Sequence, residues 1–188
     1  AALGQKLFFD TSLSANGEIS CATCHVPEKA FADGRAVAEG LFTGRRNTPP
    51  LLGATLQRWF FWDGRKDSAW SQALAPIENP TEHGTTRLAV VRALSTTYRA
   101  EYEAIFGALP ELDESTPARA MPVPNDPSSP DHQAWLTITP AQRDAIDEAF
   151  ANFGKAIHAY ERRLVPGPSP FDAYAEAVRT GGDSDALS

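Results

Sequence analysis

Apolar residues recur at helical spacing along most of this chain, and the alternation typical of strands is almost absent. The clearest stretch is 139–164, where Thr139 is the expected N-cap and Pro140 stands at the first helical position. Its apolar face carries Ile146, Phe150, Phe153, Ile157, Tyr160 and Leu164. Further helices are predicted over 1–9, 66–80, 87–95, 98–106 and 169–178. The pattern predicts an all-α fold.

Some details of these helices can also be predicted. Asp67 or Ser68 is expected to cap the helix in 66–80, which should stop near Pro76. In the helix over 98–106, the side chains expected to face inward are Tyr102, Ile105 and Phe106.

The segments between the predicted helices are rich in the chain's 15 prolines and 13 glycines. Residues 26–50 show no convincing period and are expected to form an ordered loop. Residues 108–138 combine prolines with small polar residues, which predicts a surface insertion. The polar tail 181–188 reads as a linker. We therefore expect a single domain over 1–180 with long ordered loops.

Charge and hydropathy narrow the class of partner. The net charge is −7, which argues against nucleic acid and is compatible with a basic protein partner. There is no apolar run approaching ~20 residues, so no membrane span is expected. The opening residues, AALGQKLFFD, lack the pattern of a signal peptide, so the protein is either cytosolic or has lost a leader.

Both cysteines lie in the segment Cys21-Ala22-Thr23-Cys24-His25, which fits covalent attachment of a c-type haem. Two thiols on one helical turn can each add to a vinyl group of the same porphyrin, and His25 can then ligate the iron as proximal ligand. Three alternatives compete with haem attachment. A thioredoxin-like motif would need a βαβ setting, and a disulfide is awkward at this spacing. A zinc site would need two more ligands, but the remaining histidines lack a paired spacing: His83, His132 and His158.

Haem attachment of this type takes place outside the cytoplasm. We therefore expect a periplasmic protein whose signal peptide has been removed.

Several motifs occur together in order: LGQKLFFDTSLSANGEISCATCH, RRNTP, FFWDGR, APIENPTEHG and SPFDAY. With them the chain resembles the bacterial di-haem cytochrome c peroxidase family, which includes a methylamine-utilisation relative that oxidises a protein tryptophan. The resemblance runs from residue 3 to the end, apart from the insertion. It implies a cytochrome-c-like, N-terminal peroxidatic haem domain, with 181–188 leading to a second haem domain that is not in this chain.

The resemblance also implies roles for three residues. Glu82 matches the distal carboxylate that moves a proton between the peroxide oxygens, although spacing alone would make it a solvated loop residue. Gln72 matches a second distal-pocket side chain, or is an ordinary exposed helix glutamine. Trp62 matches a tryptophan between the two haems that relays electrons, and core packing is its plainer alternative.

Other residues are candidates for binding the haem propionates or a calcium ion. Arg45 and Arg46 are candidates for binding a haem propionate, or are solvated, and Asp63 and Arg65 either stabilise a turn or reach a propionate. Asn47 matches a residue that helps bind calcium at the domain interface, or caps a turn before Pro49.

The chain departs from the family at one position. Many members carry a histidine in the loop before RRN that caps the iron at rest, whereas here Glu39 occupies that place. His83, beside Glu82, is the only nearby substitute and is expected to point away. An open or water-bound resting iron is therefore expected.

The function predicted from these observations is reduction of hydrogen peroxide to water in the periplasm. A second haem or a small redox protein would supply the electrons. Two alternatives remain open at this point: a mono-haem electron-transfer cytochrome, and a di-haem relative that oxidises a partner protein.

Overall fold

A computed structural model describes residues 1–182 and 185. Within that part of the chain the regular structure is helical, with isolated bridges in place of strands. The α-helices are α1 (Ala2–Phe9), α2 (Cys21–Cys24), α3 (Ala69–Glu78), α4 (Arg87–Thr97), α5 (Arg99–Phe106), α6 (Pro130–Thr137), α7 (Pro140–Glu161) and α8 (Pro170–Thr180). The predicted all-α fold is confirmed. In the described residues no helix is long and apolar enough to cross a membrane.

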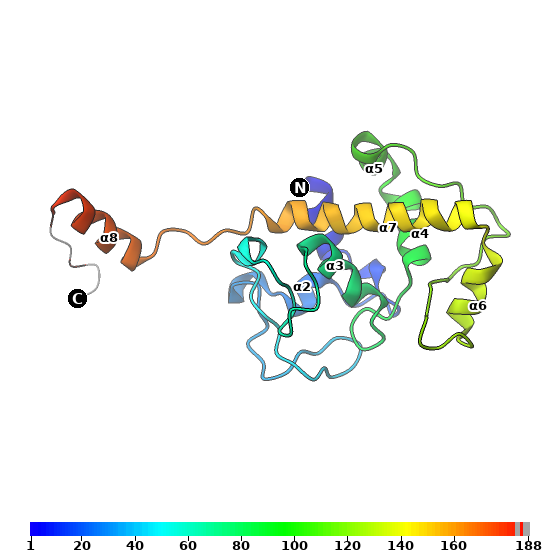
Figure 1. The fold of residues 1–188 in the computed structure, drawn as a ribbon, viewed down its shortest axis with the longest axis horizontal. Helices are drawn as coiled ribbons and strands as arrows, with labels where there is room; N and C mark the ends of the chain where they lie inside the picture. Colours follow the sequence, from blue (N-terminus) through cyan, green and yellow to red (C-terminus); the bar gives the residue numbers. More distant parts are fainter. Residues whose placement is uncertain (183–184, 186–188) are drawn as a thin grey trace.

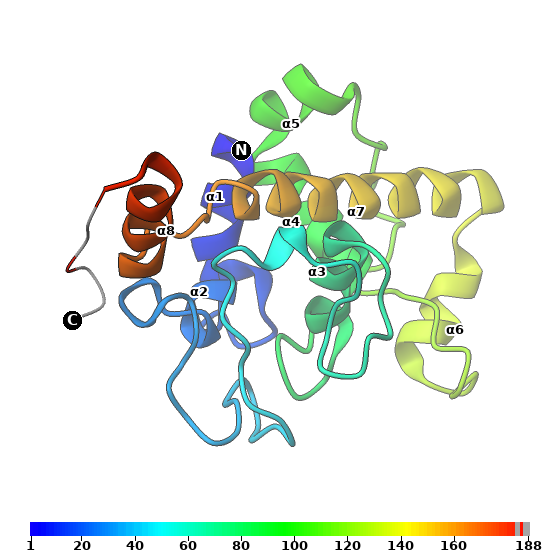
Figure 2. The same cartoon turned by 60° about the vertical axis from the view of Figure 1, so that its left-hand side comes forward.

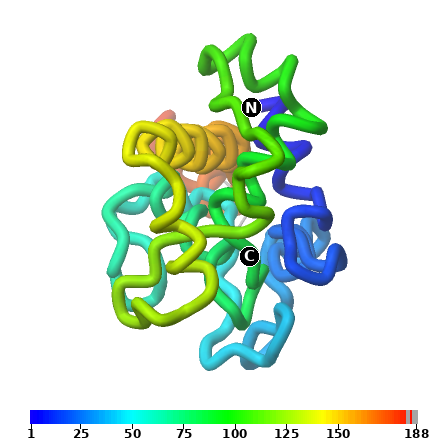
Figure 3. Tube along the Cα trace, turned by 90° about the vertical axis from the view of Figure 1, so that its right-hand side faces the viewer, coloured from blue at the N-terminus to red at the C-terminus, as the bar shows by residue number. Residues whose placement is uncertain are grey.

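Helix α7 is the axis of the fold. Thr139 accepts a hydrogen bond from the backbone N–H of Gln142, as predicted for its N-cap. Helices α1, α3 and α4 all pack against α7 (Figures 1 and 3). The core between them consists of buried apolar side chains, among them Leu7, Phe8, Ile77, Leu88, Val91, Ile146, Phe153 and Ile157.

Two glycines allow these helices to approach α7 closely. A β-carbon on Gly4 of α1 would collide with the carbonyl of Ala156 in α7. A β-carbon on Gly154 of α7 would collide with the carbonyl of Trp70 in α3. The two contacts lie two residues apart on α7. The same part of α7 therefore positions both α1 and α3, and with them the segments that follow these two helices.

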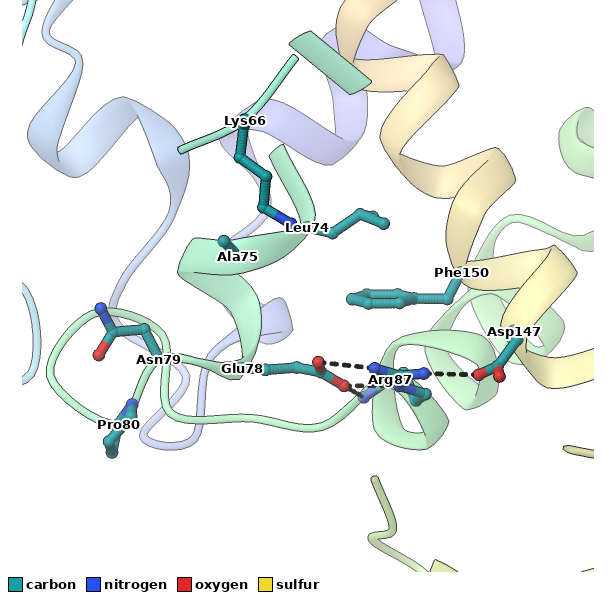
Figure 4. Close-up of a pocket in the computed structure, with 9 residues that line it drawn as sticks. All are labelled: Lys66, Leu74, Ala75, Glu78, Asn79, Pro80, Arg87, Asp147 and Phe150. Carbon is teal, nitrogen blue, oxygen red and sulfur yellow. Dashed lines mark hydrogen bonds and ion pairs between the residues drawn. The ribbon is translucent and has the colours of Figure 1, made fainter. Parts of the chain in front are cut away.

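Arg87, the first residue of α4, joins three helices (Figure 4). Its guanidinium donates two hydrogen bonds to Glu78 of α3, at 2.8 and 2.9 Å, and one to Asp147 of α7 at 2.7 Å. It also lies over the ring of Phe150, with Cζ 5.4 Å from the centroid. These partners keep the pKa of Arg87 above its usual value despite burial, which opposes them. The C-terminal end of α3 is therefore held firmly.

Helix α3 ends near Pro76, as expected, but it runs through the proline and ends two residues later, at Glu78. The carbonyl of Pro76 accepts from the N–H of His83 at 3.1 Å, and that of Ile77 accepts from Thr85 at 3.0 Å. Bonds from a later segment thus satisfy carbonyls that the helix end leaves unpaired.

The inward position expected for Ile105 is also wrong, since 57% of that side chain is exposed. Tyr102 is buried as expected, and α5 leaves α4 after Thr97, so only part of its surface meets the core.

The proline-rich insertion is only partly a surface feature. It contains α6, and Leu109, Ala120, Trp135 and Ile138 are buried. Arg92 of α4 donates to the carbonyl of Thr116 at 2.5 Å. His132 is half-buried and its Nδ1 accepts from the N–H of Val123 at 2.8 Å. The insertion is thus anchored by scattered apolar residues that show no period.

Residues 26–53 form a long loop below the helices, without regular helix after the short turn Pro27–Lys29 (Figure 2). At the other end, an extended segment after α7 carries α8 away from the body (Figure 1). The apolar side chains Phe171 and Val178 of α8 are 62% and 59% exposed. Most of the predicted linker 181–188 lies outside the described residues, and the domain division stays a prediction.

Candidate functional site

The helix α2 brings the two cysteines to one short turn. Ser20 and Thr23 form a capping box, in which the Ser20 N–H donates to the Thr23 hydroxyl at 2.9 Å. This local bonding explains why four residues form a helix at all. Cys21 and Cys24 are free, half-buried thiols, and Cys24 Sγ donates to the carbonyl of Glu39 at 3.3 Å.

His25 follows α2 directly, and its ring is fixed on one side. Nδ1 lies 2.8 Å from the carbonyl oxygen of Phe31. A carbonyl can only accept, so Nδ1 carries the proton and Nε2 keeps its lone pair. Phe8 lies beside the imidazole, with ring centroids 6.4 Å apart. Burial lowers the pKa of His25, while the carbonyls of Phe31 and Pro49 act the other way. This is the neutral tautomer that a metal ligand requires.

The chemistry of the donor set fits a thioether-linked haem. Burial raises the pKa of Cys21 to about 12 and that of Cys24 to about 11. Such a site disfavours thiolate, which zinc and redox-active cysteines need, but suits an uncharged thioether sulfur. Among the described residues, no group of three or more His, Cys, Asp or Glu side chains could hold a metal ion. The residues present therefore fit the haem better than the zinc alternative.

Glu82 lies in the turn that follows α3. Its Oε1 accepts a hydrogen bond from Asn79 Nδ2 at 2.5 Å. Its carbonyl accepts from the N–H of Leu41 in the long loop at 3.1 Å. Burial raises the pKa of Glu82, and the Asn79 bond and the charge of Arg65 only partly oppose this. The carboxyl in turn contributes to the raised pKa of Cys24, so it lies close to the cysteine segment.

His83 and Glu39 differ in their surroundings. Only 5% of His83 is exposed, and its Nδ1 has no hydrogen-bond partner among the residues that the structure describes. Burial lowers the pKa of His83 to about 4. Glu39 is exposed and its carboxylate pairs with Arg35. Glu39 therefore contacts the site through its backbone carbonyl, which accepts the hydrogen bond from Cys24. Its carboxylate lies at the surface.

Core packing, the plainer alternative for Trp62, is wrong because 62% of the side chain is exposed. Its Nε1 donates to the carbonyl of Asn47 at 2.8 Å. Phe61, directly before it, has φ +64°, so the turn over 60–66 contains a residue in the left-handed region. Gln72 is half-buried on α3, and the fully exposed alternative does not hold for it.

The arginine candidates divide into two kinds. Arg46 and Arg65 both donate to Asp63, each at 2.8 Å, and these bonds hold the pKa of that carboxyl well below its usual range. Asp63 thus joins the two arginines across the turn, while Arg45 is exposed. Asn47 Nδ2 donates to the carbonyl of Arg35 at 2.6 Å, so it links two parts of the long loop. This hydrogen bond differs from the alternative predicted for Asn47, which is a cap on a local turn before Pro49.

Two residues near the site were missed by sequence reasoning. Asn79 precedes Glu82 by three positions in ENPTEHG, and this spacing was a usable signal. Glu161 ends α7 with 6% of its side chain exposed, and burial raises its pKa to about 7. It also contributes to the raised pKa of Cys21. Nothing in the residues around Glu161, which read YERRL, distinguishes it from a solvated helix end.

Comparisons with known proteins agree on one family. The family profile described as di-haem cytochrome c peroxidase matches residues 1–180. Methylamine utilization protein MauG of Methylorubrum extorquens is 32% identical over 98% of this chain and 43% of its own length. Cytochrome c551 peroxidase of Pseudomonas aeruginosa is 34% identical, with the same two coverages.

Solved structures give the same result. The diheme peroxidase BthA from Burkholderia thailandensis superposes with a TM-score of 0.65 and 26% identity, over 92% of this chain and 41% of that one. The chain therefore spans less than half the length of these relatives.

Proposed function

The chain belongs to the di-haem cytochrome c peroxidase family, and we propose that it forms a peroxidatic haem domain that reduces hydrogen peroxide to water. The observation that carries the proposal is the pairing of a fixed, neutral imidazole at His25 with a carboxyl of raised pKa at Glu82. A mono-haem electron carrier would have no use for such a carboxyl. The domain would act in the periplasm, where haem attachment of this kind is completed.

Cys21 and Cys24 would hold the haem by two thioether bonds, and His25 Nε2 would ligate the iron. The carbonyl of Phe31 keeps the ring in the correct tautomer and orientation. When bound, the haem iron supplies the electrons that cleave the O–O bond of peroxide. Arg45 would reach a propionate from the exposed long loop, and Arg46 would do so together with Asp63.

Glu82 would handle the protons. As a carboxylate it accepts a proton from one peroxide oxygen and returns it to the other, which then leaves as water. Overall, hydrogen peroxide takes up two electrons and two protons and yields two water molecules, so solvent supplies the net protons. Gln72 would hydrogen-bond the peroxide from α3. A raised pKa at Glu82 suits this exchange near neutral pH.

Electrons would enter at the face that carries Trp62. An exposed indole can meet a second haem domain or a small redox protein without rearrangement of the core. Asn47 lies beside it and would give one amide oxygen to a calcium ion shared with that second domain.

The proposal is tested on the haem-loaded protein. Ferric optical and EPR spectra should show high-spin iron that reacts with peroxide. Glu82→Gln should slow peroxide turnover by about 10²–10⁴-fold, while Glu18→Gln, an exposed carboxyl in the first loop, should not. Low-spin iron that is inert to peroxide would support the electron carrier. Turnover unchanged in Glu82→Gln would remove the role assigned to that residue.

A further inference from the structure

The side chain of Asn79 has one possible orientation. Its Oδ1 accepts from the N–H of Thr81 at 3.0 Å and from the Thr81 hydroxyl at 2.9 Å. A backbone N–H can only donate, so the atom that faces it must be the amide oxygen. The amide nitrogen therefore points to Glu82 Oε1, 2.5 Å away.

The backbone of Asn79 reinforces this arrangement. Its carbonyl accepts from the N–H of Glu82 at 3.0 Å and from that of Gly84 at 2.9 Å. Hydrogen bonds to the Asn79 carbonyl thus hold the turn that carries Glu82. Asn79 itself follows α3, whose end is held by the ion pair of Glu78 with Arg87 (Figure 4). The position of the carboxyl is therefore tied to the helical core through this one residue.

We infer that Asn79 is a positioning residue that holds Glu82 by Oε1 and leaves Oε2 as the atom that carries the exchanged proton. The Asn79 N–H takes up one lone pair of Oε1 and makes that oxygen less basic than Oε2. The proton taken from peroxide therefore sits on Oε2 and is returned from there. The inference rests on the proposed function, because it assigns the reacting oxygen of that same site.

The same bond affects the charge of Glu82. Donation to the carboxylate favours the ionised form and offsets part of the effect of burial. The other titratable groups that act on Glu82 are the thiols of Cys21 and Cys24 from α2 and the guanidinium of Arg65. The long loop contributes mainly backbone, since the carboxylate of Glu39 is paired with Arg35 at the surface.

The test is Asn79→Asp in the haem-loaded protein. Aspartate keeps the oxygen that accepts from Thr81 and replaces only the donor with a second carboxylate oxygen. Because peroxide reduction needs ionised Glu82, the acid limb of the kcat/KM profile should move up by about one pH unit or more. The infrared band of protonated Glu82, identified by its loss in Glu82→Gln, should titrate at correspondingly higher pH.

A matched control exists in the first loop. Asn16 Nδ2 donates to Glu18 Oε2 at 3.1 Å, and both residues are exposed. Asn16→Asp makes the same change of charge in the same kind of pair, and should leave both titrations in place. A second variant, Asn79→Ser, retains an oxygen for the Thr81 N–H but has no amide donor for Glu82. It should move both titrations in the same direction by a smaller amount.

The outcomes separate the inference from the function on which it rests. If Asn79→Asp and Asn79→Ser lower turnover equally at every pH and leave the infrared titration unmoved, Asn79 is merely structural and the inference is overturned. If the ferric iron is low-spin and inert to peroxide, the proposed function fails, and if Glu82→Gln leaves turnover intact, the role of Glu82 in it is removed. In both cases the infrared titration still reports whether Asn79 controls the carboxyl.

Discussion

The indole Nε1 of Trp62 donates a hydrogen bond to the backbone carbonyl of Asn47 across 2.8 Å. This bond fixes an otherwise exposed ring against the stretch RRNTP, beside the Arg46–Asp63 ion pair. Two motifs that are separate in the sequence therefore form one surface. An aromatic ring that is exposed yet held in a single orientation is suited to contact with a partner.

Trp62→Phe should slow electron delivery more than it affects folding. The side chain is mostly exposed, so its loss should change the free energy of unfolding by less than about 1 kcal/mol. Removal of the indole should slow peroxide turnover with a reduced small c-type cytochrome on the order of tenfold, ~1.4 kcal/mol in the barrier. The measurement is turnover under saturating peroxide. Trp59→Phe, which alters a side chain of 63% exposure nearby in sequence, is the control. Equal rates for both variants would contradict electron entry at Trp62.

Covalent haem attachment predicts a definite mass. The native protein should exceed its polypeptide mass by one haem, and the increment should survive denaturation. Cys21→Ser or Cys24→Ser should leave a single thioether, and the double variant should release its haem in acidified organic solvent. Intact mass spectrometry measures each outcome. A double variant that keeps a covalent haem would show that these thiols are not the attachment points.

Gly4→Ala and Gly154→Ala should each destabilise the protein by about 3 kcal/mol, because the new methyl group collides with a backbone carbonyl of a neighbouring helix that cannot move aside. Denaturant unfolding of the holoprotein measures the change. Gly167→Ala is the control, since a β-carbon there meets nothing within 4 Å. If the Gly4 variant matched this control, the close crossing of α1 and α7 would be wrong.

Glu161 should make stability depend on pH. Its pKa in the fold is about 7, above the ordinary value of 4.5, because burial favours the protonated form. The native state therefore binds more protons than the unfolded state between these values, and the free energy of unfolding should fall by about 3 kcal/mol as pH rises from about 4.5 to above 7. Glu161→Gln should abolish this fall, which unfolding curves at several pH values would show.

Glu148→Gln alters an exposed carboxyl on the same helix and should leave the pH dependence unchanged. A pH dependence that persists in Glu161→Gln would mean that another group, and not Glu161, titrates in this range.

What the sequence alone determined is local. The helical period of α7, the cap at Thr139, and the haem-binding spacing of Cys21, Cys24 and His25 all depend on residues within a few positions of each other. Motif order was enough to identify the family. The sequence did not predict helix ends that depend on distant hydrogen-bond partners, as the continuation of α3 past Pro76 shows.

Only the tertiary structure decided the environment of each site residue. It placed Trp62 at the surface, tied Glu82 to Asn79 and removed Glu161 from water. It also anchored the insertion through Trp135. Burial and hydrogen-bond partners arise from chain segments far apart in the sequence, and they set a group's pKa and exposure. The spacing of residues along the chain does not reveal this burial or these hydrogen-bond partners.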